Sequence, residues 1–144
     1  IMKNLSMFCL SLHDSHLSNL KKINYIPVGL GENFFSDNWL RDNVGKNISN
    51  KNKYYGEYTF HYWFWKNMID DIPDNKWIGF CAYRRYWANK NTINSIKLSK
   101  IINNENFEDY VLKDIKKDWS NYETILVEKI PFGKTKFSKI IKNG

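Results

Sequence analysis

Two short and almost continuous apolar runs constrain the fold of this chain more than any other feature. Leu5–Leu12 (LSMFCLSL) and Trp77–Tyr83 (WIGFCAY) have the length of strands, and neither shows a strict alternation of apolar and polar residues. Strands buried on both faces have this pattern, and they belong to parallel sheets that helices cover. Tyr25–Val28 and Tyr122–Val127 are two further candidate strands. These runs predict a mainly parallel sheet.

Helix-length segments alternate with the predicted strands. Tyr54–Met68 follows Asn50 and Asn52, which are suited to capping, and its apolar residues cover nearly every side, so we expect a buried helix. Asn106–Trp119 has an amphipathic pattern, and Thr135–Lys142 has the length of a short helix. One stripe of the first helix combines Glu57 with Tyr54, Tyr58, His61, Phe64, Trp65 and Met68.

The organisation of the whole chain follows from this alternation. Strands and helices that alternate along 144 residues predict a single α/β domain over residues 1–144, built on one layered core. Asn33–Lys53 is polar and rich in turn residues, which predicts a long ordered loop within that domain.

The composition narrows the class of protein. Aromatic residues make up 17% of the chain, enough for a real core, which argues against a disordered protein. No stretch reaches the ~18–20 apolar residues that a membrane span requires. Cys9 and Cys81 both lie inside apolar runs, so we expect buried thiols rather than a disulfide framework. With no secretory pattern in the first residues, we expect a cytoplasmic protein, or one at the inner face of the membrane.

Charge points to an anionic partner. The net charge of +7 favours nucleic acid, a nucleotide-sugar or anionic lipid. Much of this charge reflects a bias toward lysine, because the chain has only three arginines among its 22 basic residues. The guanidinium group offers a rigid fork that suits phosphate and that lysine cannot reproduce. The positions of Arg41, Arg84 and Arg85 are therefore informative.

The arginine pair follows a predicted strand. In open α/β sheets, ligands bind in the crevice outside the carboxyl ends of the strands. Arg84 and Arg85 would hold a diphosphate there by charge-assisted hydrogen bonds. The alternative is an arginine pair bonded to carboxylates such as Glu57 or Asp71. The other residues that we assign to the same donor site are Tyr83, Tyr86, His13, Asn47 and Asn52.

Carboxylates are the candidates for catalysis, although no convincing catalytic base stands out. Glu57 and Asp42 are the two candidates, and Glu57 is also predicted to orient the arginine pair. His61, four residues after Glu57, is more often a core residue than a catalyst. No Walker loop, GxGxxG, HExxH, zinc spacing or Asp-x-Asp occurs, so we expect no required cofactor. Asp70 and Asp71 are the lesser candidates for holding a divalent metal.

Two long motifs carry a family resemblance. The segments LRDNVGKNISNKNKYYGEYTFHYWFWKN and WIGFCAYRRYW resemble domain-of-unknown-function family 4422, which occurs in capsular and exopolysaccharide gene clusters and is regarded as a glycosyltransferase family. The opening strand, the turn at Ile26–Gly29 and the YETILVEK segment fit the same order, so the resemblance covers nearly the whole chain. Ala82 replaces a histidine of the family pattern, and Gly56 replaces a cysteine.

The resemblance implies a nucleotide-sugar transferase with the GT-A type of Rossmann-like fold. In such folds a strand like Trp77–Tyr83 usually ends in Asp-x-Asp, which holds a metal on the sugar diphosphate. Here that place reads Ala82-Tyr83-Arg84-Arg85, and arginine cations can neutralise the leaving diphosphate in the metal's stead. Family members usually continue into a C-terminal acceptor-side region, which we expect this chain to lack, leaving apolar surface open to self-association.

The expected partners follow from this reading. They are a nucleotide-sugar donor and a saccharide or lipid-linked acceptor, with association at a membrane surface. Neither the donor sugar nor the anomeric outcome can be deduced from the residues. The alternative is a non-catalytic module that binds nucleic acid or saccharide, because basic charge with exposed aromatics makes a stacking platform. Burial of most aromatics in the predicted helix and strand argues against nucleic acid.

Overall fold

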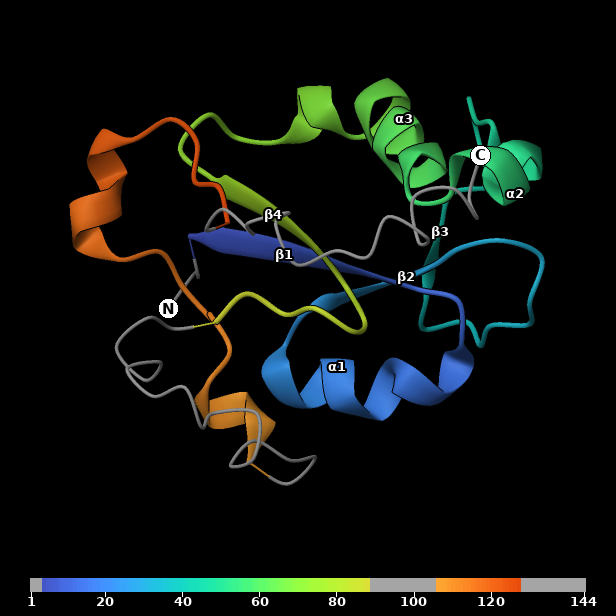
Figure 1. Ribbon diagram of the computed structural model, residues 1–144. Coiled ribbons are helices and arrows are strands. Elements are labelled where there is room, and N and C mark those ends of the chain that lie inside the picture. The colour runs from blue at the N-terminus through green and yellow to red at the C-terminus, as the bar shows by residue number, and fades with distance from the viewer. Residues whose placement is uncertain (1–3, 89–105, 128–144) are drawn as a thin grey trace, which may run out of the picture.

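The central feature of the fold is a fully parallel sheet. The computed structural model describes residues 4–88 and 106–127. Within them four strands form one sheet in the order β3-β2-β1-β4 (Figure 1). The strands are β1 (Leu5–Ser11), β2 (Ile26–Gly29), β3 (Leu40–Arg41) and β4 (Trp77–Ala82), and each neighbouring pair is parallel. The predicted α/β class and parallel sheet are confirmed, and the arrangement is Rossmann-like.

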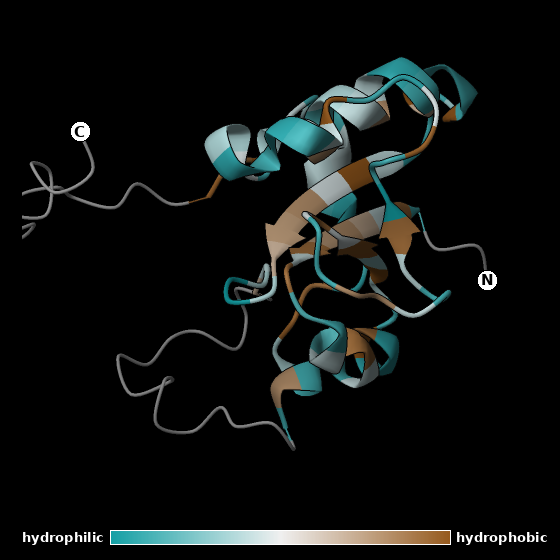
Figure 2. Ribbon diagram, turned by 90° about the vertical axis from the view of Figure 1, so that its right-hand side faces the viewer, coloured by the Kyte–Doolittle hydropathy of each residue, from teal (hydrophilic) through white to brown (hydrophobic). Residues whose placement is uncertain are grey.

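Helices cover both faces of the sheet. α1 (Leu17–Ile23) packs on one face, and α2 (Asn52–Tyr55) with α3 (Tyr58–Asn67) lies over the other (Figures 1 and 2). Neither face of β1 is therefore exposed to solvent, which explains its continuous apolar run. Met7 and Cys9 join the α1-side core, whereas Phe8 and Leu10 join the α3-side core. This alternation follows from the two-residue period of a strand.

The two cysteines lie side by side in the sheet. Cys9 of β1 is in register with Cys81 of β4, and both thiols are free. Cys9 is fully buried and Cys81 is partly buried. A hydrogen bond with Cys9 and, to a smaller extent, burial raise the pKa of the Cys81 thiol well above its usual range. The expectation of buried thiols is confirmed for Cys9 and nearly so for Cys81.

The predicted helix Tyr54–Met68 is divided in two. Gly56 has a φ of 53°, which ends α2 and lets the chain turn before α3 begins. α3 buries Phe60, Trp63 and Phe64, whereas Tyr58 and Trp65 are exposed. The expectation of a helix buried on all sides, with Tyr54, Tyr58 and Trp65 on the inner stripe, is therefore wrong. The inner face of α3 is instead the stripe of Phe60, Trp63 and Phe64, because Phe60 and Phe64 pack on Phe8 and Phe80 of the sheet.

The predicted helix Asn106–Trp119 is also wrong. This segment forms only short 3-10 turns at Phe107–Asp109 and Lys117–Asn121. Tertiary contacts take the backbone groups that a helix would use, because the Leu112 amide donates to the Trp87 carbonyl and the Leu112 carbonyl accepts from the Tyr25 hydroxyl. Phe107, Val111 and Leu112 are still buried, so the apolar pattern marked the core but not the backbone.

The predicted strand Tyr122–Val127 does not pair with the sheet. The amides of Trp77 and Tyr83 donate to the carbonyls of Asn4 and Leu10, on the side of β4 that faces β1. Because backbone groups alternate along a strand, those of Phe80 and Ala82 face the free edge of the sheet. The Phe80 carbonyl accepts from the Trp87 indole at 2.7 Å, and the Ala82 carbonyl accepts from the Arg85 amide at 2.8 Å. Two acceptors that a fifth strand needs are thus occupied.

Two further predictions concern connections and the tail. The segment Asn33–Lys53 is mostly loop as predicted, but it contains β3 and a 3-10 turn at Ser49–Lys51. The predicted helix Thr135–Lys142 lies outside the described residues. No helix in the described part of the chain is long and apolar enough to cross a bilayer.

Candidate functional site

The order of the strands locates a crevice. The chain leaves β1 to build β2 and β3 on one side, then returns to add β4 on the other side of β1. In open parallel sheets, the point where the strand order reverses leaves a crevice outside the carboxyl ends of the two strands. That point lies here between β1 and β4. The residues that follow Ser11 and Ala82 therefore meet at the same place.

A compact cluster of aromatic and cationic side chains occupies this place. The His16 ring stacks on the Tyr83 ring, with centroids 4.4 Å apart and an interplanar angle of 18°. His13 contacts the same ring edge-on at 6.1 Å, and the Arg84 guanidinium lies 4.9 Å from the Tyr83 centroid. Three side chains from β1–α1 and the β4 turn thus share one aromatic centre. His13 and Tyr83 were predicted to meet here; His16 was not.

Hydrogen bonds from the end of β1 hold the two histidines. The Ser11 hydroxyl lies 2.7 Å from Nδ1 of His16 and accepts the His13 amide at 3.1 Å. Asp14, next along the chain, accepts the Ser36 amide at 2.8 Å and the Ser36 hydroxyl at 2.9 Å. These bonds lower the pKa of Asp14 and anchor the turn at Asp14–His16 to the loop after β2. The histidines are therefore positioned before any ligand arrives.

The electrostatics of the cluster favour an anion. Burial, the charge of His13 and that of Arg84 lower the pKa of His16, in that order of size. His16 is therefore mainly neutral near pH 7 in the free protein, because its ordinary pKa is already about 6.5. A phosphate beside it would favour the protonated form and raise that pKa. The site can thus gain a positive charge when an anion binds.

The arginine pair sits on a tight turn. The Arg85 amide donates to the Ala82 carbonyl, which closes the turn Ala82–Arg85, and both arginine side chains are exposed. Within the described residues, neither forms an ion pair with Glu57 or Asp71, so the alternative reading of a pair bonded to helix carboxylates is not what the structure has. The guanidinium of Arg84 lies over the Tyr83 ring, and the exposed side chains of Arg84 and Arg85 can both contact a ligand.

Glu57 stands apart from the arginines. It is exposed at the N-cap position of α3, where a carboxylate is favourable to the helix dipole. Burial lowers the pKa of His61, and the Glu57 charge opposes that shift. Glu57 stands one helical turn before His61, whose ring lies 4.7 Å from that of Phe80 in β4. The predicted contact with the arginine pair is absent among the described residues.

The β2–β3 half of the same edge is built differently. The Arg41 guanidinium donates to the carbonyls of Gly31 at 2.6 Å and Asn33 at 3.3 Å, and it lies 4.5 Å from the Phe35 centroid. Asp42 is 0% exposed, and neither carboxylate oxygen has a hydrogen-bond partner among the described residues. This catalytic candidate is therefore enclosed by the fold and does not face the cluster of His16, Tyr83 and Arg84 from an exposed position.

The remaining predicted residues have structural partners. Asn47 organises its own loop by bonding to Gly45 and Ser49, and Asn52 bonds to Gly56 and Thr59. The Asn52 amide oxygen lies 3.3 Å from where a Cβ on Gly31 would stand, so Asn52 borders the carboxyl edge without reaching the cluster. Tyr86 packs on Tyr25 and Phe107 in the α1-side core, and burial raises its pKa to about 12.

The metal candidates lie outside the crevice. Asp70 and Asp71 belong to an exposed 3-10 turn between α3 and β4, on the approach to the opposite end of β4. In the described part of the chain, no three His, Cys, Asp or Glu side chains gather in a way that could hold a metal ion. The cations of the crevice are therefore the groups available to an anion at the switch point.

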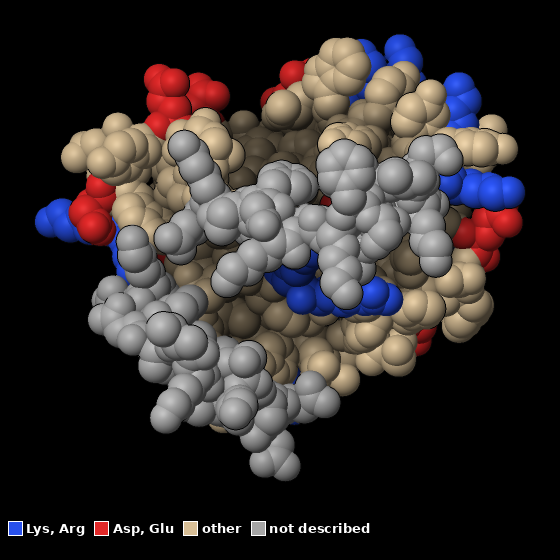
Figure 3. Space-filling view, in the orientation of Figure 1, with Lys and Arg blue, Asp and Glu red and all other residues tan. Residues whose placement is uncertain are grey.

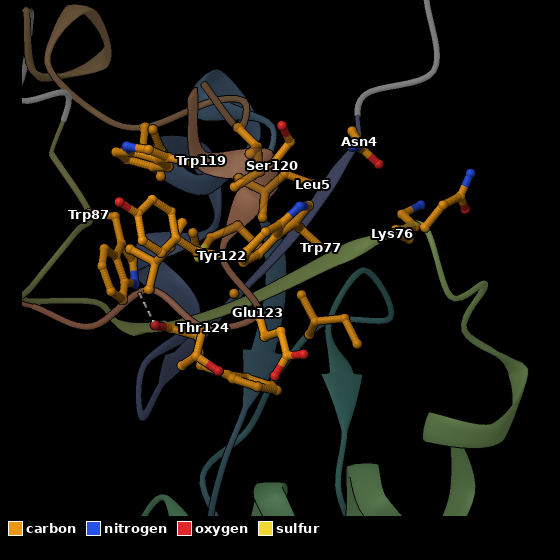
Figure 4. Close-up of a pocket in the computed structure, with 18 of the residues that line it drawn as sticks. Asn4, Leu5, Lys76, Trp77, Trp87, Trp119, Ser120, Tyr122, Glu123 and Thr124 are labelled. Atoms are coloured by element: carbon orange, nitrogen blue, oxygen red, sulfur yellow. Dashed lines mark hydrogen bonds between the residues drawn. The ribbon is translucent and has the colours of Figure 1, made fainter. Parts of the chain in front are cut away.

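A separate hollow of about 950 Å³ runs beside the free edge of β4 (Figure 4). Trp77, Trp87, Trp119 and Tyr122 line it, and the Trp87 indole points onto the edge of β4. Its floor includes Leu5 and Lys76, at the amino ends of β1 and β4. The hollow is thus distinct from the crevice at the carboxyl edge.

Sequence reasoning missed Ser11 and His16. A signal was present, because His13 and His16 are three residues apart directly after an apolar run, which places both at the end of a buried strand. The contact between His16 and Tyr83 could not be read from the sequence, since it depends on β4 pairing with β1.

Comparison with known proteins identifies the family. No curated protein and no solved structure matches the chain. A family model described as a domain of unknown function, DUF4422, matches residues 8–143, which include the whole crevice and both motifs noted in the sequence. The chain therefore belongs to the DUF4422 family.

Proposed function

We propose that this protein is a glycosyltransferase that binds a nucleoside-diphosphate sugar at the crevice between β1 and β4. One observation carries the proposal: the reversal of strand order brings His16 and Arg84 onto the ring of Tyr83. The His16 ring centroid lies 4.4 Å from the Tyr83 centroid, and the Arg84 guanidinium lies 4.9 Å from it. An aromatic ring beside cations suits a ligand that combines a planar or pyranose group with phosphates. The resemblance to a family of polysaccharide gene clusters supports sugar transfer.

The residues would divide the work of binding. Arg84 and Arg85 neutralise the diphosphate, and protonated His16 adds a third positive charge. Tyr83 supplies the ring surface against which the base or the sugar rests. The Ser11 hydroxyl keeps His16 in place through the 2.7 Å contact with Nδ1. Because His16, Tyr83 and Arg84 contact one another in the free protein, less side-chain ordering is left for the moment of binding.

The reaction would break the bond between C1 of the sugar and the diphosphate oxygen. The electron pair leaves with the diphosphate, where the arginine cations stabilise the developing charge. An acceptor hydroxyl forms the new bond to C1 and gives its proton to a base. Glu57 is the exposed carboxylate one helical turn before His61, which contacts Phe80 of β4, and is our candidate for that base. Asp42 is fully buried and cannot touch a substrate in this conformation. A saccharide or lipid-linked acceptor fits this scheme.

Calorimetry with nucleoside diphosphates tests the proposal. UDP, GDP, CDP and dTDP are titrated with a chelator present and again with Mn²⁺, and the tightest binder is repeated as its sugar conjugates. We expect one diphosphate to bind without metal. Arg84→Lys and Arg85→Lys should each weaken it, because lysine keeps the charge but loses the bidentate fork. Lys22→Gln on α1 is the matched control and should bind as the parent does.

Two results would overturn the proposal. Binding that requires a divalent ion would remove the arginines from the role of the metal. Absence of binding to every diphosphate, together with binding of single-stranded RNA or of free saccharide, would identify a binding module instead. Release of free sugar or its transfer to an acceptor, followed by mass spectrometry, separates a transferase from a protein that only binds the nucleotide.

A further inference from the structure

The outer surface of α2 and α3 exposes large aromatic side chains. Tyr54 is 81% exposed, Tyr58 73% and Trp65 56%. Phe34, in the loop after β2, is 83% exposed and borders the 3-10 turn that leads into α2. Burying such rings would stabilise a protein by about 1.5–3 kcal/mol each. A group of exposed rings on one layer of the molecule therefore indicates a surface that contacts something.

Lysines accompany these rings. Lys66 places its ammonium 3.1 Å from the Trp65 centroid, and Lys53 lies 5.9 Å from that of Tyr54. Lys46 and Lys51 are exposed in the segment that leads into α2. We call this group the aromatic–lysine surface; its residues are Phe34, Lys46, Lys51, Lys53, Tyr54, Tyr58, Trp65 and Lys66.

Lysines lie along the whole of this layer: Lys53 belongs to α2, whereas Lys66 and Lys46 lie at the carboxyl end of α3, where the Lys46 backbone bonds to Asn67. Asp70, Asp71 and Asp74 follow α3 at its far end and are all exposed. Figure 3 shows basic side chains over α2 and α3, with acidic side chains beyond α3 and also below the α2 end. Glu57 is the one acidic residue within α2 and α3 and the turn that joins them. The α2 end of the layer lies beside the carboxyl edge, where Asn52 borders Gly31.

We propose that the aromatic–lysine surface binds an anionic lipid bilayer. Tyrosine and tryptophan favour the interface between headgroups and acyl chains, and lysines beside them pair with anionic headgroups. Each basic residue near such a membrane contributes about 1 kcal/mol. Burial of the exposed rings adds to this attraction. A protein that rests on this surface brings the carboxyl edge beside α2 close to the membrane.

Nucleic acid fits this surface less well. A base stacks on an open ring face, but the Trp65 face already carries the Lys66 ammonium at 3.1 Å. Val44 lies beside α3 and is 60% exposed. Its side chain can neither stack on a base nor form a hydrogen bond with one, but it can be buried in the apolar part of a bilayer interface.

This inference is independent of the proposed enzymatic function, because it concerns binding in the absence of any nucleotide. Its failure would leave the crevice between β1 and β4 untouched. If both hold, a lipid-linked acceptor would reach the crevice from the surface on which the protein rests.

Vesicle flotation tests the inference. The full chain is mixed with vesicles of neutral phosphatidylcholine, or with vesicles in which a third of the lipid is phosphatidylglycerol. We expect flotation only with the anionic vesicles and a decline as salt rises. Lys51→Gln with Lys53→Gln should reduce the partition coefficient by about 20-fold. Tyr54→Ser with Tyr58→Ser should reduce it by about tenfold or more.

Matched controls separate this surface from general charge. Lys21→Gln with Lys22→Gln changes the net charge equally on α1, and Tyr122→Ser removes an equally exposed ring elsewhere. Both should change the partition coefficient by less than about twofold. Circular dichroism confirms that each variant is folded. Equal loss in the control and test variants would overturn the inference, as would binding of single-stranded RNA with no binding of anionic vesicles.

Discussion

The two halves of the carboxyl edge use arginine in opposite ways. In the β2–β3 half, Arg41 gives its protons to the carbonyls of Gly31 and Asn33, and its flat face rests near Phe35. In the β1–β4 half, Arg84 and Arg85 are exposed on a turn and keep their guanidinium protons available. The first arginine closes a loop, whereas Arg84 lies over the Tyr83 ring at the crevice and Arg85 is exposed beside it in sequence. Position after a strand therefore does not by itself make an arginine a ligand-binding residue.

The difference follows from what each strand end needs. β3 has only two residues, so few backbone hydrogen bonds hold the loop between β2 and β3. The Arg41 side chain holds this loop instead, through its bonds to the carbonyls of Gly31 and Asn33. β4 has six residues, and its end is closed by the backbone bond from Arg85 to Ala82. A turn that closes through its backbone leaves its side chains available. The predictions below test whether this division of roles holds.

The largest effect is expected on the β1–β4 side. Replacing Arg84 and Arg85 together by alanine removes at least two charge-assisted hydrogen bonds, each contributing roughly 1.5–3 kcal/mol. Affinity for the nucleoside diphosphate should fall by about 100-fold or more, with little change in the melting temperature. Calorimetry and thermal melts on the same samples measure both. A melting temperature that falls with the affinity would mean that this pair is structural as well.

The complementary change is expected on the β2–β3 side. Arg41→Met removes two hydrogen bonds and the contact with Phe35 while keeping most of the apolar stem. The free energy of unfolding should fall by roughly 2 kcal/mol. Diphosphate affinity should stay within about twofold of the parent. Urea denaturation measures the first quantity and calorimetry the second. If Arg41→Met instead weakens binding as the Arg84 variants do, the two halves form one site.

A smaller effect is expected at Asp42. Its carboxylate is fully buried, and the described residues offer it no hydrogen bond, so a charge there costs free energy. Asp42→Asn should raise the free energy of unfolding by about 1 kcal/mol, which corresponds to roughly 3–4 °C in melting temperature. Differential scanning calorimetry of the ligand-free protein checks this. A fall in stability would show that the charge has a partner in solution; Asp37→Asn, exposed in the preceding loop, is the control.

The smallest effect is a dependence on pH. Burial lowers the pKa of both His16 and His61, so the folded protein takes up a proton less readily than the unfolded chain. This contribution to stability is present above the unfolded pKa of about 6.5 and is lost as the pH falls through the lower folded pKa. Melting temperatures should thus decline from pH 7.5 to pH 5, and His61→Phe should flatten part of that decline.

Diphosphate binding should respond to pH in the opposite direction. A protonated His16 adds a positive charge beside the phosphates, so affinity should rise as the pH falls while stability declines. His16→Gln keeps a polar group beside Ser11 and should remove the rise. An affinity that falls with pH in the parent would argue that His16 is not next to the diphosphate.

Apolar periodicity accounts for the parts of the fold that were predicted correctly. β1, β2 and β4 coincide with apolar runs because a strand covered on both faces tolerates few polar residues. The same rule placed His13, Tyr83 and Arg84 at the ends of strands, but it did not predict β3, which lies in a segment expected to be a loop. Residues 106–127 show its limit, since Phe107 and Leu112 are buried as their pattern indicates, but the backbone follows contacts with Trp87 and Tyr25 instead of a helix.

The sequence by itself determined the parallel α/β sheet and some of the polar residues at its carboxyl edge, namely His13 and the arginine pair. Only the tertiary structure decided which of them meet. The pairing of β4 with β1 brings Tyr83 onto His16, whereas Asp42 turns inward and Tyr86 joins the core beside Tyr25. The physical reason is that apolar patterning is local and reports burial. The neighbours of a strand end depend on the order in which strands join the sheet, and residues more than 60 positions apart set that order.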